Sequence, residues 1–411
     1  MNDMPLDGIR VCDLTWIIAG PVCTRVLADF GAEVIRVEHE QALDSIRMGR
    51  PLVGETPTGN NSGFFNYISR NKKSIALNAR HPDGHDVLRR LIAASDVVVE
   101  NFSASVMDSW GLGYDQLREI NPGIIYCSVS GFGHSGRDKE FTTWGPTAQA
   151  LSGLTYMSGV PGMPSAGWGY SFMDHTAGYY AANAVMMALH HRNRTGEGQW
   201  IDMSQVEAGI VLTGPAVLDA QVNGTSWRAD PGLPPGNHAW EPKVAPHNAY
   251  RAPGEDRWLA IAATNDAEWT ALASIVEPHL ESDPRFASNE SRLEHELALD
   301  EAIGAWVAEH DAYDAMELLQ GAGVPAGMCQ TAGDRFERDP QLKSRDWWHV
   351  LPHPELGDCD YDGIVPKLSL APGQMRKSSP TFGEDTADVM RDVVGMTDEE
   401  FFSLTELGVF M

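Results

Sequence analysis

The chain has 411 residues, and chains of this length usually fold into more than one domain. Its hydrophobic content of 43% and charged content of 21% are typical of a globular protein, and no apolar run reaches the roughly 18 residues of a transmembrane helix. A formal net charge of −27 disfavours binding to nucleic acid or to an anionic membrane surface. The five scattered cysteines predict neither a disulfide framework nor a metal site, and the lack of an export signal predicts a cytoplasmic location.

The first part of the chain alternates short apolar runs with amphipathic runs. The apolar runs, which predict strands, cover residues 8–15, 32–38, 96–102 and 124–131. The amphipathic runs, which predict helices, cover residues 19–31, 82–95 and 106–122. This alternation is typical of βαβ units, so we expect an α/β fold with a parallel sheet.

The second part begins with a long helix over 177–194 that is apolar on most faces and is therefore expected to be buried. A Gly-rich turn over 192–199 and a strand over 200–204 follow it. Residues 223–248 are rich in Gly, Pro and Asn and predict a long loop, after which 250–266 predict a hairpin around a PGED turn. Helices are expected over 288–303 and 397–407, and residues 365–370 resemble a strand.

The string GFGHSG at 131–136 fits the glycine fingerprint of dinucleotide-binding folds. In such folds a helix opens directly after the glycines, whereas here the polar segment RDKEFTTWGP follows. The motif also lies after the fourth predicted strand and not after the first. The sequence therefore disfavours a nicotinamide or flavin site, and His134 within this loop is interpreted as an ordinary loop histidine.

Asp174 stands at the head of the long helical run and has two interpretations. An aspartate at a helix start is typical of an N-cap, whose side chain accepts hydrogen bonds from free backbone N–H groups. A carboxylate at this place is also stabilised by the helix dipole and could act as a nucleophile. The local sequence alone favours the cap.

An ordered set of segments resembles the family III CoA-transferases, which include formyl-CoA transferase, carnitine CoA-transferase, benzylsuccinate CoA-transferase and the related 2-methylacyl-CoA racemases. The matching segments include "PLDGIRVCDLTWIIAGPVCTRVLADFGAEVIRVE", "NKKSIALNARHPDG", "DVVVENFSASVMDSWGLGYDQL", "QALSGL", "MDHTAG", "RTGEGQWIDMSQVE" and "GVPAGMCQTAGDRFERDPQL". They run from Pro5 almost to the C-terminus, and the match is poor over about 220–320.

The resemblance implies a Rossmann-like large domain with a parallel sheet, formed by residues 1–222 and 326–411. It implies a smaller α+β domain over residues 223–325. Two chains of the family thread through each other as an interlocked dimer, so the expected partner is a second copy or a related subunit. The implied substrates are coenzyme A thioesters and carboxylic acids, and the family chemistry requires no metal.

The resemblance also assigns roles to residues. The motif MDHTAG stands where the family carries its catalytic aspartate, so Asp174 is expected to attack the thioester and to form an aspartyl-CoA thioester. Gly178, one turn later, either lets substrate approach or packs against a neighbouring element. Arg80, Arg36 and Lys73 are candidates for pairing with the CoA phosphates. The residues expected to contact CoA are Ile17, Ile18, Ala19, His39, Leu77, Asn78, Arg80, Asn101, Phe102 and Ser103.

Three positions depart from the family pattern. Gly145 stands where formyl-CoA transferase has a Glu and the racemases have a His, and glycine cannot abstract a proton. His39 and Ser109 stand where the family often has more basic residues. Gly145 argues against the main alternative function, an acyl-CoA racemase or isomerase. A non-catalytic subunit of a hetero-oligomeric transferase is the other alternative.

The acceptor acid is the least readable part of the function. Five aromatic residues accompany the active-site segments, and such residues are most often core: Trp16, Trp144, Tyr156, Trp168 and Tyr170. Any that line the pocket would favour an aryl or bulky acid. The benzylsuccinate branch, which the sequence resembles most, implies succinyl-CoA as donor and a substituted succinate as acceptor. Residues 232–240 (GLPPGNHAW) are the candidate for the loop that shields the intermediate in formyl-CoA transferase.

Overall fold

The computed structural model describes residues 4–160, 162–224, 236–238 and 242–411. The chain divides into two compact units. Unit 1 comprises Met1–Leu154, Trp168–Gly214 and Gln341–Met411, and unit 2 comprises Thr155–Gly167 and Pro215–Pro340. The domain limits expected from the sequence, after residues 222 and 325, both fall inside unit 2.

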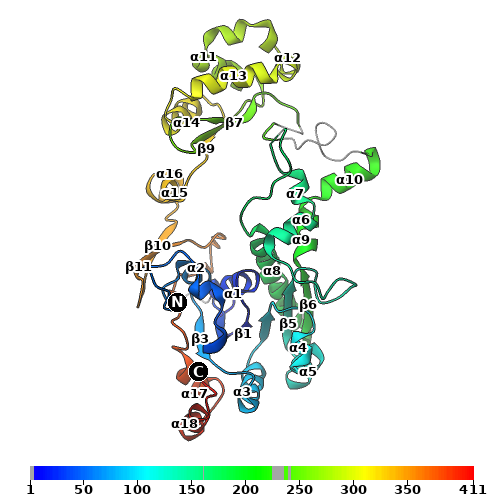
Figure 1. Cartoon of the computed structure of the whole chain (residues 1–411), viewed down its shortest axis with the longest axis vertical. Coiled ribbons are helices and arrows are strands. Elements are labelled where there is room, and N and C mark those ends of the chain that lie inside the picture. Colours follow the sequence, from blue (N-terminus) through cyan, green and yellow to red (C-terminus); the bar gives the residue numbers. More distant parts are fainter. Residues whose placement is uncertain (1–3, 161, 225–235, 239–241) are drawn as a thin grey trace. The chain divides into compact units, whose positions relative to one another are not determined.

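Unit 1 is built on a six-stranded sheet of order β3-β2-β1-β4-β5-β6, in which every neighbouring pair is parallel (Figure 1). The strands are β1 (Arg10–Leu14), β2 (Glu33–Glu38), β3 (Lys73–Ala76), β4 (Val97–Glu100), β5 (Ile125–Ser130) and β6 (Gln199–Ser204). Strand order reverses between β1 and β4, as in Rossmann-like folds. The α/β fold class is thus confirmed, although the sequence had not predicted β3 as a strand.

Helices cover both faces of this sheet. Alternate side chains of β1 point to opposite faces, so Val11 packs with α1 and α8 whereas Cys12 packs with α3 and α5. The α-helices of unit 1 are α1 (Ala19–Asp29), α2 (Gly63–Ser69), α3 (Pro82–Ala93), α4 (Val106–Ser109), α5 (Tyr114–Ile120), α6 (Gly145–Leu151), α8 (Phe172–Thr195), α9 (Gln205–Leu212), α17 (Thr386–Asp392) and α18 (Asp398–Glu406). Two short 3₁₀ helices, η1 (Glu40–Ala42) and η2 (Ser45–Met48), follow β2.

Helix α8 is the long apolar helix that the sequence predicted. It ends at Gly196, whose φ of 79° supplies the left-handed C-cap that the Gly-rich turn suggested. The expectation that it is buried on most faces is wrong, because one face packs on α1 and the sheet while Met187, on the opposite side, is 72% exposed. Neither α8 nor any other helix in the described ranges is long and apolar enough to cross a membrane.

The C-terminal segment covers the edge of the sheet at β3. The backbone N–H of Ser74 donates to Oδ2 of Asp385 at 2.9 Å, and that of Ala76 donates to Oγ1 of Thr386 at 2.9 Å. These side chains stand where a further strand would bind, so the edge is closed to strand addition. Figure 1 shows α17 beside β3, with α18 following it.

An antiparallel hairpin of β10 (Trp348–His353) and β11 (Gly357–Asp362) precedes that segment. Residues 365–370, which the sequence likened to a strand, instead form bends. Within the described part of the chain they pair with no strand, and Pro366 lacks the N–H that a ladder requires. The predicted terminal helix is confirmed as α18, which Thr397 caps by accepting from the Glu400 N–H.

Unit 2 has its own core around a three-stranded antiparallel sheet of order β7-β8-β9. Strands β7 (His247–Arg251) and β8 (Trp258–Ala262) form the predicted hairpin, and β9 (Ala326–Met328) pairs with β8. Its helices are α11 (Asp266–Val276), η3 (Pro278–Ser282), η4 (Pro284–Phe286), α12 (Asn289–Glu294), α13 (Glu296–Val307), α14 (Ala312–Gly321) and α15 (Ala332–Glu337). Helices α7 (Leu154–Met157), α10 (Gly214–Asn223) and α16 (Pro340–Ser344) lie where the chain passes between units.

Candidate active site

Asp174 lies in the first turn of α8 and is 7% exposed. The N-cap of this helix is Ser171, three residues earlier, so the interpretation of Asp174 as the cap is wrong. Instead its Oδ1 atom accepts a hydrogen bond of 2.8 Å from Nε2 of Gln205, the first residue of α9. The side chain of Ser171 and the backbone N–H of Gly145 also lie close enough to the carboxylate to lower its pKa. Three segments far apart in sequence therefore meet at one carboxylate.

Burial and hydrogen bonding act on Asp174 in opposite directions. Burial raises the pKa of the carboxyl above its usual range, while the hydrogen bonds from Gln205, Ser171 and the Gly145 N–H lower it, and the net direction is upward. Desolvation therefore outweighs the hydrogen bonds in setting the direction of this pKa shift. A more basic carboxylate is also a stronger nucleophile.

Gly145 is the residue at which the sequence departs most clearly from the family pattern. A Cβ atom at this position would lie 2.6 Å from Oδ2 of Asp174 and 3.0 Å from Cβ of Ser171. No side chain fits there while Asp174 keeps its conformation. Position 145 therefore has no side chain that could act as a base, and its backbone lies close to the Asp174 carboxylate instead.

Gly178 lies one turn further along α8 and faces α1. A Cβ atom here would lie 2.7 Å from the carbonyl oxygen of Ala19 and 2.8 Å from Cβ of Val22. Of the two roles considered for Gly178, this contact supports close helix packing. The first turn of α1 and the second turn of α8 are thereby held close together.

A cavity of about 450 Å³ opens at the carboxyl edge of β1, β2, β3 and β4. Ligands of open α/β sheets bind at this edge, where the strand order reverses. Seven of the residues expected to contact CoA line it together: His39, Leu77, Asn78, Arg80, Asn101, Phe102 and Ser103. Its other lining residues include Trp16, Val106 and Trp110, and the Phe102 and Trp110 ring centroids lie 5.5 Å apart.

The remaining three predicted contacts are placed differently. Ile18 and Ala19 are buried, Ala19 belongs to the core of the sheet, and neither they nor Ile17 line this cavity. Trp16, one residue earlier, does line it. The sequence had placed Trp16 among the aromatic residues of the site and Trp110 inside a matching segment, but assigned no CoA contact to either.

Of the three candidates for phosphate binding, one lies at the cavity and two do not. Arg80 lines the cavity. Arg36 is 1% exposed and pairs with Glu38 and Asp44, so it is not accessible to a phosphate. Lys73 begins β3 at the opposite edge of the sheet and pairs with Glu33 at 2.6 Å. His39 lines the cavity, and its buried Nε2 atom has no hydrogen-bond partner among the described residues.

The expectation that most of the five aromatic residues are core is wrong. Trp144, Trp168 and Tyr170 are each more than half exposed in unit 1. Trp168 packs edge-on against Phe172, and the Tyr170 hydroxyl lies 2.9 Å from Nε2 of His175, beside Asp174. Tyr156 belongs to unit 2. Most of the loop at 232–240 lies outside the described residues.

The GFGHSG segment is followed by bends and turns. No helix opens after it until α6 begins at Gly145. Its conformation is tied to β6, because the backbone N–H of His134 donates to Oδ1 of Asp202 at 2.6 Å. Within the described ranges, no group of three or more His, Cys, Asp or Glu residues is arranged to hold a metal ion.

The chain matches the model of a family described as CoA-transferase family III over residues 6–386. It is 33% identical over 408 residues to the succinyl-CoA–D-citramalate CoA-transferase of Chloroflexus aurantiacus, covering 97% of this chain and 96% of that protein. It is 32% identical over 406 residues to the beta subunit of the succinyl-CoA–L-malate CoA-transferase of the same organism, covering 98% and 97%. The crystal structure of a CAIB/BAIF family protein from Brucella suis matches with a TM-score of 0.86 at 31% identity, covering 95% of this chain and all of that chain.

Proposed function

This chain belongs to CoA-transferase family III, and on that premise we propose that it transfers CoA through a covalent intermediate on Asp174. The protein is an enzyme that moves CoA from an acyl-CoA donor to a carboxylic acid. The observation that carries the assignment of Asp174 is its environment: a buried carboxylate that accepts a hydrogen bond from Gln205 and is closely approached by the backbone of Gly145. Such an environment suits a carboxylate that first acts as a nucleophile and whose oxygen then carries negative charge when Cγ is attacked.

The transfer proceeds in steps that conserve the thioester. An oxygen of Asp174 attacks the donor carbonyl carbon, the C–S bond breaks, and CoA departs as a thiolate, which leaves a mixed anhydride between Asp174 and the donor acid. The thiolate attacks Cγ of Asp174, which releases the donor acid and leaves an aspartyl-CoA thioester. The acceptor carboxylate attacks the same carbon, the thiolate leaves again, and it returns to the acceptor acyl carbon. Asp174 is then regenerated, and one thioester has replaced another.

Two donors are placed to act on the charge that develops at Cγ. Each attack on Cγ of Asp174 drives negative charge onto a carboxyl oxygen, and fixed donors lower the barrier to such steps. Nε2 of Gln205 and the N–H of Gly145 already contact the resting carboxylate. They support transfer and give no support to racemisation, which needs a base where Gly145 stands.

We assign the CoA moiety to the cavity at the carboxyl edge of the sheet. The aromatic pair Phe102 and Trp110 offers a stacking surface for the adenine, and Arg80 offers a cation for the phosphates. The segment from Trp16 to Ala19 runs from the cavity wall to the packing contact with α8 at Gly178. This path supports a pantetheine arm directed along the β1–α1 loop toward Asp174.

The donor we propose is succinyl-CoA, and the acceptor is a substituted succinate. The two relatives described above are named for D-citramalate and L-malate, which are both hydroxy-substituted succinates. The exposed aromatic side chains near Asp174 leave room for the alternative acceptor class, an aryl-substituted succinate. A panel of both kinds of acid, offered with succinyl-CoA and read by mass of the new CoA ester, separates the two classes.

A second chain is the expected partner. Helices α8 and α9 expose Tyr180, Met187 and Val211, and large exposed apolar side chains support an interface with a second chain. One relative is a beta subunit, so the partner could also be a related chain. Activity of the purified chain alone, with its mass in solution, distinguishes the homodimer from a hetero-oligomer and from a non-catalytic subunit.

The decisive experiment concerns Asp174. We expect Asp174→Ala to abolish transfer while its circular dichroism and melting temperature stay those of the parent. Trapping with hydroxylamine or borohydride during turnover, followed by peptide mapping, should mark residue 174. Asp115→Ala is the matched control, because Asp115 is an exposed acid in the first turn of α5. Turnover by Asp174→Ala, or a label on another residue, would refute the assignment.

A further inference from the structure

The loop between β1 and α1 contains a residue in an unfavourable backbone conformation. Ile17 has a φ of 64°, in the left-handed region that a β-branched residue rarely adopts. The next residue, Ile18, is the N-cap of α1 and has no side-chain cap hydrogen bond. The conformation of this loop must therefore be maintained by contacts with other parts of the chain.

Asp44 supplies one of those contacts. The backbone N–H of Ile17 donates to Oδ2 of Asp44 at 2.9 Å, and the same oxygen accepts from Nη2 of Arg36 at 2.6 Å. Its Oδ1 accepts from the backbone N–H of Ile46 at 3.1 Å. Asp44 is 2% exposed, so water is poorly placed to replace it as an acceptor. Both oxygens of this carboxylate thus accept hydrogen bonds, and Oδ2 holds the backbone of Ile17.

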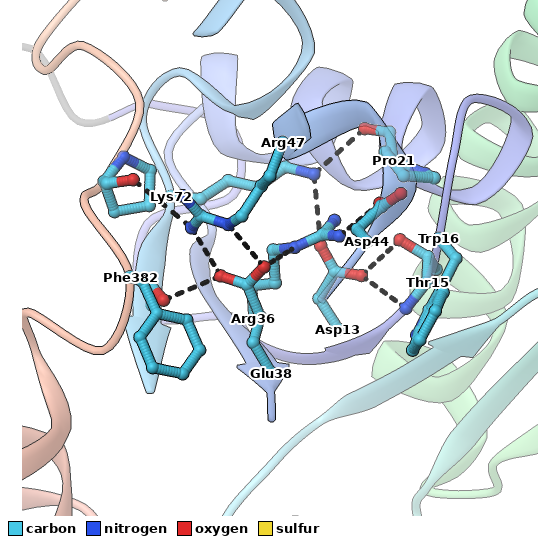
Figure 2. Close-up of polar contacts among 12 residues, drawn as sticks. Asp13, Thr15, Trp16, Pro21, Arg36, Glu38, Asp44, Arg47, Lys72 and Phe382 are labelled. Carbon is cyan, nitrogen blue, oxygen red and sulfur yellow. Dashed lines mark hydrogen bonds and ion pairs between the residues drawn. The ribbon is translucent and has the colours of Figure 1, made fainter. Parts of the chain in front are cut away.

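A network of buried charges holds Asp44 in place. Figure 2 shows Arg36 between Asp44 and Glu38, with Nε of Arg36 lying 3.2 Å from Oε1 of Glu38. Glu38 is bound in turn by Nη2 of Arg47 at 2.6 Å. All four side chains are almost completely buried. Such a network has few alternative arrangements, so the position of the Asp44 carboxylate is well defined.

The two residues before Ile17 are held in the same way. The backbone N–H of Thr15 donates to Oδ1 of Asp13 at 3.0 Å. The amide of Asn101 accepts from the Trp16 N–H at 2.7 Å and donates to the Trp16 carbonyl at 2.9 Å. Three consecutive residues are therefore each bound by a buried or half-buried side chain. Trp16 and Asn101 also line the cavity, so the loop conformation shapes the cavity wall.

We propose that Asp44 is a positioning residue for CoA binding, which acts by holding Ile17 in its left-handed conformation. The inference rests on the proposed function in that it places CoA in this cavity. When the Asp44 acceptor is lost, Ile17 relaxes to negative φ, and the loop moves Trp16 and the start of α1. Only the fraction of molecules with the loop in the original conformation binds CoA, so the apparent Kd rises in inverse proportion to that fraction.

The test couples Asp44 with Ile17. By isothermal titration with CoA, we expect Asp44→Ala to raise Kd about tenfold, while kcat at saturating substrate changes less than about threefold. Glycine adopts positive φ without strain, so the loop of Ile17→Gly should keep its conformation without the Asp44 acceptor, and this variant serves as the reference background whatever its own Kd. In the Ile17→Gly background, Asp44→Ala should then raise the Kd for CoA by less than about threefold.

A merely structural role for Asp44 predicts a different pattern. It predicts that Asp44→Ala weakens CoA binding equally in the parent protein and in Ile17→Gly. It also predicts a fall in kcat that follows the amount of folded protein. This result would overturn the proposal. If Asp44→Ala does not fold, Asp44→Asn carries the same test, because its neutral amide is a weaker acceptor. Asp29→Asn is the matched control, since it weakens a buried pair with Arg70 that does not contact the loop. Its Kd for CoA should equal that of the parent.

Phe102→Ala separates this inference from the function on which it rests. Phe102 lines the cavity and does not contact Asp44 through any of the hydrogen bonds described above. If Phe102→Ala weakens CoA binding and the Asp44 variants do not, the positioning role is refuted and the cavity assignment stands. If Phe102→Ala leaves Kd unchanged, CoA binds elsewhere and both proposals are refuted.

Discussion

Nε2 of Gln205 lies 2.8 Å from Oδ1 of Asp174, so the first residue of α9 binds a carboxylate in the first turn of α8. Both residues are buried, and the Oε1 atom of Gln205 has no hydrogen-bond partner among the described residues. The side chain is therefore oriented by Asp174 itself. A donor in this position acts on the resting carboxylate and on the oxyanion that forms when Cγ is attacked.

We expect Gln205→Leu to lower kcat by roughly 10²-fold, because loss of one fixed oxyanion donor typically has an effect of this size. KM for the CoA donor should change little, since Gln205 does not line the CoA cavity. Steady-state kinetics with succinyl-CoA measure both constants. A rise in KM with unchanged kcat would show that Gln205 serves binding and not the chemical steps.

The same variant should shift the pH dependence of the reaction. Burial raises the pKa of Asp174, and the hydrogen bond from Gln205 opposes that rise. Asp174 attacks in its ionised form, so activity increases as pH rises through its pKa. Removing Gln205 raises the pKa further, and the acidic limb of the kcat profile should move to higher pH. A limb that stays in place or moves to lower pH would contradict this account.

Gly145→Ala should inactivate the enzyme without unfolding it. The added Cβ would lie 2.6 Å from Oδ2 of Asp174, so the carboxylate must turn away from the N–H of Gly145. We expect kcat to fall at least roughly tenfold, because an attacking group moved by about an ångström loses its alignment. Gly214→Ala is the control, since a Cβ there meets no atom of the described residues within 4 Å. Equal activity of the two variants would show that Asp174 has room to move.

Arg80→Ala should weaken binding of the CoA substrates while leaving kcat nearly unchanged. Loss of a charged hydrogen bond to phosphate predicts a rise in KM of about tenfold. The effect should be absent with a pantetheine thioester, which lacks the nucleotide phosphates. The ratio of KM values for the two thioesters measures this difference. A similar loss with both would place Arg80 near the acyl end of the substrate.

Glu100 should make the protein less stable as pH rises. Burial raises its pKa to about 8, although the Phe102 N–H and the Tyr126 hydroxyl hydrogen-bond to it. Between about pH 4.5 and pH 8 the carboxyl is thus neutral in the folded protein and ionises on unfolding. Its contribution to the free energy of unfolding is therefore complete below about pH 4.5 and declines up to about pH 8. Glu100→Gln stays neutral, so its free energy of unfolding, from urea titrations at several pH values, should fall less over that range. Parallel pH profiles would contradict the assignment.

Local periodicity was enough to predict most of unit 1. The alternation of apolar and amphipathic runs identified β1, α1, β2, α3, β4 and β5 because each element buries one face, or both, in a regular repeat. β3 was not predicted, since its four residues, KSIA, are too short to show a period. Residues 365–370 show the opposite error: they are apolar enough for a strand but pair with no strand among the residues that the structure describes.

The burial of α8 shows another limit of the sequence. Alanine, tyrosine and methionine are distributed around this helix, so its composition does not indicate which side faces the core. Packing on α1 selects the side with Ala177, Ala181 and Val185 and leaves Met187 exposed. Likewise, no local signal distinguished Arg36 from Arg80 as a phosphate ligand. Their roles separate because β2 directs Arg36 inward to Asp44 and Glu38.

The sequence by itself determined the family, the α/β class and the candidate nucleophile, because these depend on ordered motifs and on repeats that neighbouring residues create. The tertiary structure alone decided what surrounds Asp174 and what supports the CoA cavity. Gln205 and Asp44 carry no distinguishing local pattern, and the sequence marked Gly145 only as a missing base. All three gain their roles from contacts with residues distant in the sequence. Such contacts are fixed by the packing of whole helices and strands, which is a property of the folded chain and not of any segment.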